Sequence, residues 1–182
     1  MSVIFLDRDG VINEFPGVSQ YVVRLDDFRF IPGALEALRK LTEAGFELFV
    51  VSNQGCVSRG LISAKELAVM TDRMTIDIKK SGGRLEGVFY CLHQKSDNCE
   101  CKKPKIKMFQ DALKGRVVDL ESVYFIGDSR EDVEAGKALG CRTILVLSGR
   151  TKKADIAEFS PKPDQIKKDL LEAVTWILEK KR

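Results

Sequence analysis

Short apolar runs alternate with amphipathic stretches along most of this 182-residue chain. The run VIFL at residues 3–6 contains no polar side chain, which is typical of a strand buried on both faces. Between such runs, apolar residues recur at helical spacing. This alternation predicts a parallel sheet with helices on both faces. The predicted strands are Val3–Leu6, Phe46–Ser52, Val88–Cys91, Val123–Gly127 and Thr143–Leu147.

Glycines and a capping pattern mark the ends of the predicted helices. Ser63-Ala64-Lys65-Glu66 is a capping-box sequence, and glycine is the usual residue just after a helix. The predicted helices extend from Pro32-Gly33 to Gly45, from Ser63 to Gly82-Gly83, from about Lys105 to Leu113, from Glu131 to Gly140, and over the apolar stripe from Leu170 to Leu178.

Composition narrows the class of protein. The length suits a single domain over residues 1–182. A net charge of +3 gives no indication of nucleic-acid binding, and no apolar run reaches the ~20 residues of a membrane span. No secretion leader precedes the first strand, so we expect a cytoplasmic protein, and a monomer. Five cysteines fit a reducing compartment, with four available for a metal.

The first predicted strand ends in two carboxylates, Asp7 and Asp9, followed by Gly10. Side chains two positions apart on a strand point to the same side, so we expect both in one pocket. Carboxylates this close repel each other unless a cation or a shared proton relieves them. Their chemical uses are binding a hard metal such as Mg²⁺, nucleophilic attack and acid/base catalysis.

Polar residues follow the other strands at the same predicted edge of the sheet, where ligands bind in folds of this kind. Ser52, Asn53 and Gln54 can donate to phosphate oxygens, although a plain turn has the same sequence. Asp128 can complete a cation site with Asp7. Asp132 can orient a lysine or stabilise a helix N-terminus. In the K-K-P segment, Lys102 or Lys103 can neutralise charge on a phosphoryl group.

In this order, D-x-D-G-V, S-N, K-K-P and G-D-x-x-x-D resemble the four-part signature of the haloacid dehalogenase superfamily, over roughly residues 1 to 150. The resemblance implies a Rossmann-like doubly wound sheet. It implies that Asp7 is the nucleophile that forms an aspartyl-phosphate and that Asp9 is the general acid/base. Mg²⁺ would be held by Asp7, the Asp9 backbone carbonyl and Asp128, while Ser52 and Lys103 steady the phosphoryl group. The short segments between these motifs leave no room for a cap domain, so we expect an open site.

A second cluster comprises Cys91, His93, Cys99 and Cys101, which bring three thiols and the chain's single histidine within eleven positions. Three cysteines and one histidine form a closed tetrahedral Zn²⁺ set, so we predict a structural zinc-binding loop that braces Lys102 and Lys103. The alternative is reduced cysteines beside a surface histidine. Of the two other cysteines, Cys141 fits the core, whereas Cys56 fits either the core or the site.

The pattern C-x-H…C-x-C-K-K-P resembles two phosphatase families, the heptose bisphosphate phosphatases and the histidinol-phosphate phosphatases. Residues 5–13, 20–22, 27–30 and 58–60 are similar to the heptose enzymes. Against this, the five-residue gap after His93 matches the histidinol enzymes, and Lys102 replaces a usual arginine. The resemblance implies a small phosphorylated substrate, D-glycero-D-manno-heptose 1,7-bisphosphate cleaved at its C7 phosphate, with histidinol phosphate as the alternative.

Short loops near residues 15–22 and 56–61 must then supply selectivity. We predict substrate contacts from Asn53, Gln54, Arg59 and Lys102, with Arg130 as a further basic residue for a second phosphate.

Other classes of protein share part of this pattern. A phospho-acceptor signalling domain also phosphorylates a strand-end aspartate, but Asp9 and the zinc loop favour a hydrolase. A zinc-stabilised binding protein with a dead site does not need every catalytic position intact. A polynucleotide 3'-phosphatase needs a basic groove with stacking aromatics, which a net charge of +3 and a single tryptophan do not favour.

Overall fold

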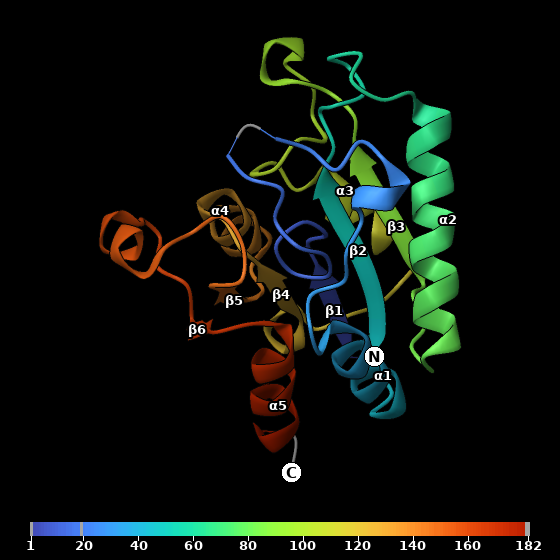
Figure 1. The fold of residues 1–182 in the computed structure, drawn as a ribbon. Helices are drawn as coiled ribbons and strands as arrows, with labels where there is room; N and C mark the ends of the chain where they lie inside the picture. The colour runs from blue at the N-terminus through green and yellow to red at the C-terminus, as the bar shows by residue number, and fades with distance from the viewer. Residues whose placement is uncertain (1, 19, 181–182) are drawn as a thin grey trace.

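The computed structural model describes residues 2–18 and 20–180. Its centre is a six-stranded sheet in the order β3-β2-β1-β4-β5-β6 (Figure 1). Every neighbouring pair is parallel, as the sequence predicts. The strands are β1 (Val3–Leu6), β2 (Glu47–Asn53), β3 (Gly87–Cys91), β4 (Tyr124–Gly127), β5 (Arg142–Val146) and β6 (Gln165–Lys167).

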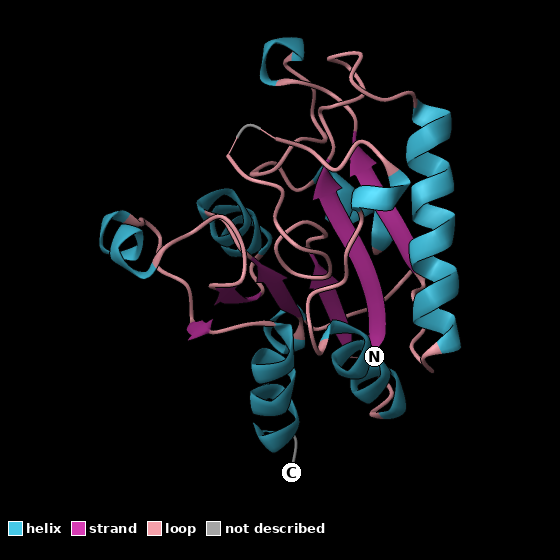
Figure 2. Cartoon of the chain, in the orientation of Figure 1, coloured by secondary structure: helices cyan, strands magenta, loops and turns pink. Residues whose placement is uncertain are grey.

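Helices cover both faces of this sheet (Figure 2). They are α1 (Ala34–Glu43), α2 (Ala64–Lys80), α3 (Lys107–Ala112), α4 (Arg130–Leu139) and α5 (Leu170–Lys180), with short 3-10 helices η1 (Leu25–Asp27), η2 (Lys95–Asp97), η3 (Leu120–Ser122) and η4 (Lys153–Glu158). Alternate strand residues enter two separate cores. Ile4 and Leu6 pack with α1 and α5, whereas Val3 and Phe5 pack with α3 and α4. The predicted doubly wound α/β fold is confirmed.

Local signals locate the helix ends well. The Ser63 side chain accepts from the Glu66 N–H while the Glu66 carboxylate accepts from the Ser63 N–H, which is the predicted capping box. Gly140 ends α4 with a φ of 89°. Strand β6 is missing from the prediction, because its single apolar residue, Ile166, is half exposed at the sheet edge and gives no apolar run.

The strand order determines where a ligand can bind. Because β1 pairs with both β2 and β4, the chain reverses its winding direction at β1. Ligands of open parallel sheets bind beyond the carboxyl ends of the strands at such a switch point. Asp7 follows β1 directly, and Asp128 follows β4. No helix within residues 2–18 and 20–180 is long and apolar enough to cross a bilayer.

Candidate active site

A cavity of about 300 Å³ opens at the carboxyl ends of β1, β2 and β4. Eight of the residues predicted for catalysis, magnesium or substrate line it together: Asp7, Asp9, Ser52, Asn53, Arg59, Lys102, Lys103 and Asp128. They come from segments far apart in the sequence, and the parallel register brings them to one edge of the sheet.

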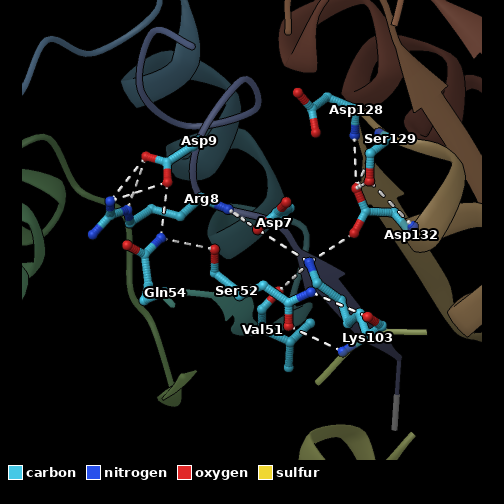
Figure 3. A network of polar contacts seen from close by, with 11 residues as sticks. Asp7, Arg8, Asp9, Val51, Ser52, Gln54, Lys103, Asp128, Ser129 and Asp132 are labelled. Carbon is cyan, nitrogen blue, oxygen red and sulfur yellow. Dashed lines mark hydrogen bonds and ion pairs between the residues drawn. The ribbon is translucent and has the colours of Figure 1, made fainter. Parts of the chain in front are cut away.

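Lys103 is the buried cation of this cavity, at 3% exposure. Its Nζ lies 3.1 Å from Asp7 Oδ1 and 2.7 Å from Asp132 Oδ1, and donates to the Val51 carbonyl at 2.8 Å (Figure 3). Burial alone would lower the pKa of Lys103, but Asp132 and Asp7 outweigh it and raise the pKa above its usual range. Asp132 therefore orients the lysine, and it also belongs to the capping box that begins α4.

Asn53 fixes the backbone of the same lysine. Its Oδ1 accepts from the Lys103 N–H at 3.0 Å, and its Nδ2 donates to the Lys103 carbonyl at 3.2 Å. This pair of hydrogen bonds ties the end of β2 to the K-K-P segment. Lys103 is thus held at both its backbone and its ammonium group.

Asp128 sits in a cradle that only glycines can form. A Cβ on Gly10 would lie 2.2 Å from Asp128 Oδ2, and one on Gly149 would lie 1.9 Å from it. Gly10 also has a φ of 82°, which favours glycine. The Arg150 N–H donates to Asp128 Oδ2 at 2.6 Å. The carboxylate is therefore held from one side by backbone alone.

The carboxylates of this cluster repel one another. Burial raises the pKa of Asp7, Lys103 and Ser52 lower it, and Asp132 and Asp9 raise it, so that the resulting pKa is about 6. Burial, Asp132 and Asp7 raise the pKa of Asp128 well above its usual value. Oxygens of Asp7, Asp128 and Asp132 lie within 4.8 Å of one another, and carboxylate oxygens are the ligands that Mg²⁺ prefers. Asp132 has both carboxylate oxygens engaged, Oδ1 by Lys103 at 2.7 Å and Oδ2 by the Ser129 hydroxyl at 2.6 Å, so Asp7 and Asp128 fit a magnesium ion best.

Asp9 has quite different neighbours. Its Oδ1 accepts from Arg8 Nε at 3.1 Å, from Arg8 Nη2 at 2.9 Å and from Asn13 Nδ2 at 2.8 Å. Its Oδ2 accepts from Arg8 Nη2 at 3.1 Å and from Gln54 Nε2 at 2.8 Å. Asp9 lines the cavity, but its carboxylate is not part of the acidic cluster.

Arg8 is a site residue that the sequence did not reveal. It is the largest fully buried side chain among the described residues, at 1% exposure. Its guanidinium stacks over the Tyr90 ring at 5.7 Å and contacts Met70 Sδ at 3.8 Å. Burial alone would lower its pKa, but Asp9 and Tyr90 outweigh it and raise the pKa, so Arg8 stays charged. From the sequence, an arginine between two aspartates is expected to be exposed, and only the path of the loop after β1 shows that Arg8 is buried.

Two residues expected to contact substrate have other neighbours. Gln54 is fully buried, does not line the cavity and donates to Asp9 and Ser52. Arg130 pairs with Glu134 one turn along α4 and does not line the cavity, so its expected contact with a second phosphate stays a prediction. The cavity instead includes basic residues that the sequence analysis omitted, Lys95 from the zinc loop and Arg150 after β5.

The predicted zinc ligands come together. Donor atoms of Cys91, His93, Cys99 and Cys101 all lie within 4.8 Å of one another. Cys91 Sγ is 3.0 Å from Cys101 Sγ and 3.5 Å from Cys99 Sγ, and His93 Nδ1 is 3.3 Å from Cys101 Sγ. Three sulfurs and one nitrogen at such separations fit a closed tetrahedral Zn²⁺ set.

The zinc loop borders the cavity through residues beside the ligands. Gln94 and Lys95 follow His93 and line the cavity, and Lys102 follows Cys101 and donates to the His93 carbonyl at 3.3 Å. A metal held here would therefore order one wall of the cavity.

The remaining cysteines are structural in position. Cys141 packs in the core against α3 and α4. Cys56 is buried, and its Sγ lies 3.6 Å from both the backbone carbonyl and Oε1 of Gln54. Cys56 thus lies behind the Asp9 contacts rather than in the cavity.

The parallel sheet, the strand-end aspartates and the buried lysine are those of an HAD-like hydrolase. The HAD-hydrolase-like family model matches residues 100–173. Relatives that match most of the chain indicate the family within this class of hydrolases. A D-glycero-beta-D-manno-heptose-1,7-bisphosphate 7-phosphatase of Haemophilus ducreyi is 35% identical over 181 residues, covering 96% of this chain and 97% of the relative. The enzyme of that name from Pseudomonas aeruginosa is 36% identical over 149 residues, covering 82% and 83%.

A solved structure agrees with these relatives. The D,D-heptose 1,7-bisphosphate phosphatase of B. bronchiseptica, complexed with magnesium and phosphate, has a TM-score of 0.92 and 32% identity, with 99% of both chains covered. The chain therefore belongs to the family of heptose 1,7-bisphosphate 7-phosphatases.

Proposed function

We propose that this protein is a magnesium-dependent phosphatase that works through an aspartyl-phosphate on Asp7. The observation that carries the proposal is the placement of Asp7 beside the cavity, 3.1 Å from a buried Lys103 that Asp132 also holds. Asp7 and Asp128 would hold Mg²⁺, with the Asp9 backbone carbonyl as a further ligand. The metal would supply positive charge opposite the phosphoryl oxygens.

In the first step, a carboxylate oxygen of Asp7 attacks phosphorus and forms a P–O bond. The bond from phosphorus to the substrate oxygen breaks, and Asp9 gives that oxygen a proton. Lys103 faces the negative charge that the transferring phosphoryl group carries, and Ser52 is the neighbouring hydroxyl.

In the second step, water attacks the same phosphorus, and Asp9 takes its proton. The bond between phosphorus and Asp7 breaks, its electron pair returns to the Asp7 carboxylate, and inorganic phosphate leaves. Asp9 thus ends each cycle with the proton that it lost in the first step.

We propose D-glycero-D-manno-heptose 1,7-bisphosphate as the substrate, cleaved at C7. Family membership supports this choice, and so does the charge of the cavity wall. Arg59, Lys95, Lys102 and Arg150 line the cavity around the catalytic group and can hold a second phosphate. Arg59 is stacked over the Tyr21 ring at 5.7 Å, so the loops near residues 20 and 59 contact each other in the cavity wall. Binding energy from a remote phosphate can be used for catalysis.

Steady-state kinetics test this substrate. The panel contains both anomers of the heptose bisphosphate, fructose 1,6-bisphosphate and histidinol phosphate, with Lys102→Ala beside the wild type. We expect the highest kcat/KM for a heptose bisphosphate, and we expect Lys102→Ala to lower it roughly tenfold by removing one charged contact. Lys114→Ala is a control, since Lys114 is exposed after α3. A wild-type preference for histidinol phosphate would reassign the substrate and leave the reaction unchanged.

The five free cysteines also support action in a reducing compartment, and we propose the cytoplasm. We propose a monomer of one domain as the working unit.

A further inference from the structure

Among the described residues, the hydrogen-bond partners of the Asp9 carboxylate are all donors. Arg8 donates to both carboxylate oxygens, Asn13 donates to Oδ1, and Gln54 donates to Oδ2 at 2.8 Å (Figure 3 shows Arg8, Asp9 and Gln54). An ionised carboxylate only accepts, so these contacts suit the charged form. A protonated Asp9 would need an acceptor for its proton, and this arrangement offers none.

The proposed reaction needs both forms of Asp9, because the residue gives a proton in the first step and takes one in the second. Arg8 has no acceptor atom. The Asn13 amide is fixed, because its Nδ2 also donates to the Glu14 carbonyl at 3.0 Å and reversal would set two oxygens against each other. Gln54 is the remaining neighbour whose side chain carries both a donor and an acceptor.

The other partners of the Gln54 amide tolerate its reversal. Nε2 lies 3.2 Å from the Ser52 hydroxyl, and Oε1 lies 3.6 Å from Cys56 Sγ. A hydroxyl and a thiol can each donate or accept. After reversal, Oε1 would accept from the protonated Asp9 carboxyl and from the Ser52 hydroxyl. Nε2 would donate to Cys56 Sγ, and the Cys56 thiol would still donate to the Gln54 backbone carbonyl, 3.6 Å away. After reversal, the polar atoms of the Gln54 and Cys56 side chains therefore still have partners, which limits the free-energy cost of burying Gln54 in either orientation.

We propose that Gln54 is a positioning residue for Asp9 and that its side-chain amide reverses between the two steps of the reaction. The proposal rests on the aspartyl-phosphate mechanism proposed above. Before the first step, Oε1 accepts the Asp9 carboxyl proton and keeps it available to the leaving oxygen. Before the second step, Nε2 donates to the Asp9 carboxylate and holds it as the base that takes the proton from water. The Ser52 hydroxyl then accepts from Nε2, and its proton points to the Asp7 side of the site, where Ser52 contacts the Asp7 carboxylate.

Two substitutions separate the steps. Gln54→Leu keeps the approximate shape of the side chain and serves neither form of Asp9. Gln54→Glu keeps an acceptor and loses the donor, so it serves the protonated form alone. The measurement is the steady-state fraction of phosphorylated protein, by intact-mass spectrometry after acid quenching in Mg²⁺ buffer. It is made with p-nitrophenyl phosphate, whose leaving group needs no proton, and with the heptose bisphosphate, whose alkoxide does.

For Gln54→Leu we expect kcat to fall roughly 10- to 100-fold with little change in KM, which is the range for a hydrogen bond to a charged group. Phosphorylated protein should accumulate with p-nitrophenyl phosphate, because the second step alone slows. It should accumulate much less with the heptose bisphosphate, because both steps slow. For Gln54→Glu we expect accumulation with both substrates.

The control is Ile78→Val, which changes a fully buried core residue far along α2. It should lower stability without raising the phosphorylated fraction. Accumulation with both substrates in Gln54→Leu would overturn the reversal, because Gln54 would then serve the carboxylate alone. A phosphorylated fraction equal to that of the wild type in both variants would overturn the positioning role. Absence of turnover in the wild type would instead contradict the proposed function.

Discussion

Asp7 and Asp9 are two residues apart and line the same cavity, yet their surroundings are opposite. Asp7 lies with Asp128 and Asp132 in a cluster of three carboxylates, and the ammonium of Lys103 is the cation that contacts it. Asp9 lies against the guanidinium of Arg8, and two side-chain amides complete its hydrogen bonds.

The difference separates a cluster that can bind a metal ion, around Asp7, from a carboxylate that the protein itself holds in position, Asp9. The Asp7 cluster carries more negative than positive charge. Burial and the neighbouring carboxylates raise the pKa of Asp7 and Asp128, and a metal ion would relieve the repulsion. The Asp9 contacts are satisfied within the protein itself. One half of the site therefore needs a ligand to be complete, whereas the other half is complete without one.

The comparison predicts its largest effect at Asp7. Asp7→Asn should abolish turnover, a loss of at least about 10⁴-fold, because an amide is a poor nucleophile. Magnesium affinity should fall with it. Steady-state kinetics and magnesium titration give the measurement, with the exposed Asp27→Asn as control. Near wild-type activity in Asp7→Asn would exclude the covalent mechanism.

Asp9→Asn should affect the Asp9 half of the site and leave magnesium binding by the Asp7 cluster intact. We expect kcat to fall about 10²- to 10⁴-fold, because acid/base catalysis is lost, while magnesium still binds. Stability should also fall, by about 3 kcal/mol, because the buried charge of Arg8 loses its counter-charge. Calorimetry and magnesium titration on the same variant test both. If Asp9→Asn were as stable as the wild type, Arg8 would not depend on Asp9.

The zinc loop should affect stability before chemistry, because it borders the cavity through Gln94, Lys95 and Lys102. Its contact with Gln54 is a backbone hydrogen bond, from the Gln54 N–H to the Cys91 carbonyl at 2.7 Å. We expect about one zinc per chain in the purified protein. Cys99→Ser should lower the zinc content. It should also lower the free energy of unfolding by about 3 kcal/mol, which corresponds to roughly 10 °C in Tm. Activity below that Tm should largely remain. Zinc-free protein with an unchanged Tm would contradict a structural zinc site.

Much of the fold and half of the site could be predicted from the sequence, for physical reasons that differ by region. Apolar runs mark strands buried on both faces, and the edge rule for parallel sheets then brings Asp7, Ser52, Lys103 and Asp128 together. The zinc ligands could be predicted because the ligand residues are close together in the sequence.

The rest of the site depends on the direction in which loop side chains point, and the periodicity of apolar residues does not predict that direction. Arg8 turns inward because the loop after β1 curls back on itself, with the Arg8 carbonyl accepting from the N–H groups of Ile12 and Asn13. Gln54 follows β2, and its N–H donates to the Cys91 carbonyl at the end of β3. Arg130 does not line the cavity, and its guanidinium pairs with Glu134 one helical turn along. Strand β6 went undetected because an exposed edge strand needs no apolar run.

The smallest effect that we predict is a pH dependence of stability in the metal-free protein. Burial raises the pKa of Asp7 from 3.8 to about 6, so the folded protein binds this proton more tightly than the unfolded chain does. The resulting stabilisation is fully present below a pH of about 4 and is lost as the pH rises through about 6. It amounts to about 1–3 kcal/mol, since one pKa unit corresponds to about 1.4 kcal/mol.

The charges of other acidic groups also depend on pH, so the quantity to measure is the free energy of unfolding of the wild type minus that of Asp7→Asn, both without metal. We expect this difference to fall between pH 4 and pH 7 and to recover when Mg²⁺ is added at pH 7, because the ion replaces the proton as the relief of the repulsion. A difference that is flat with pH would mean that Lys103 alone neutralises Asp7, and the contrast between the two halves of the site would then disappear.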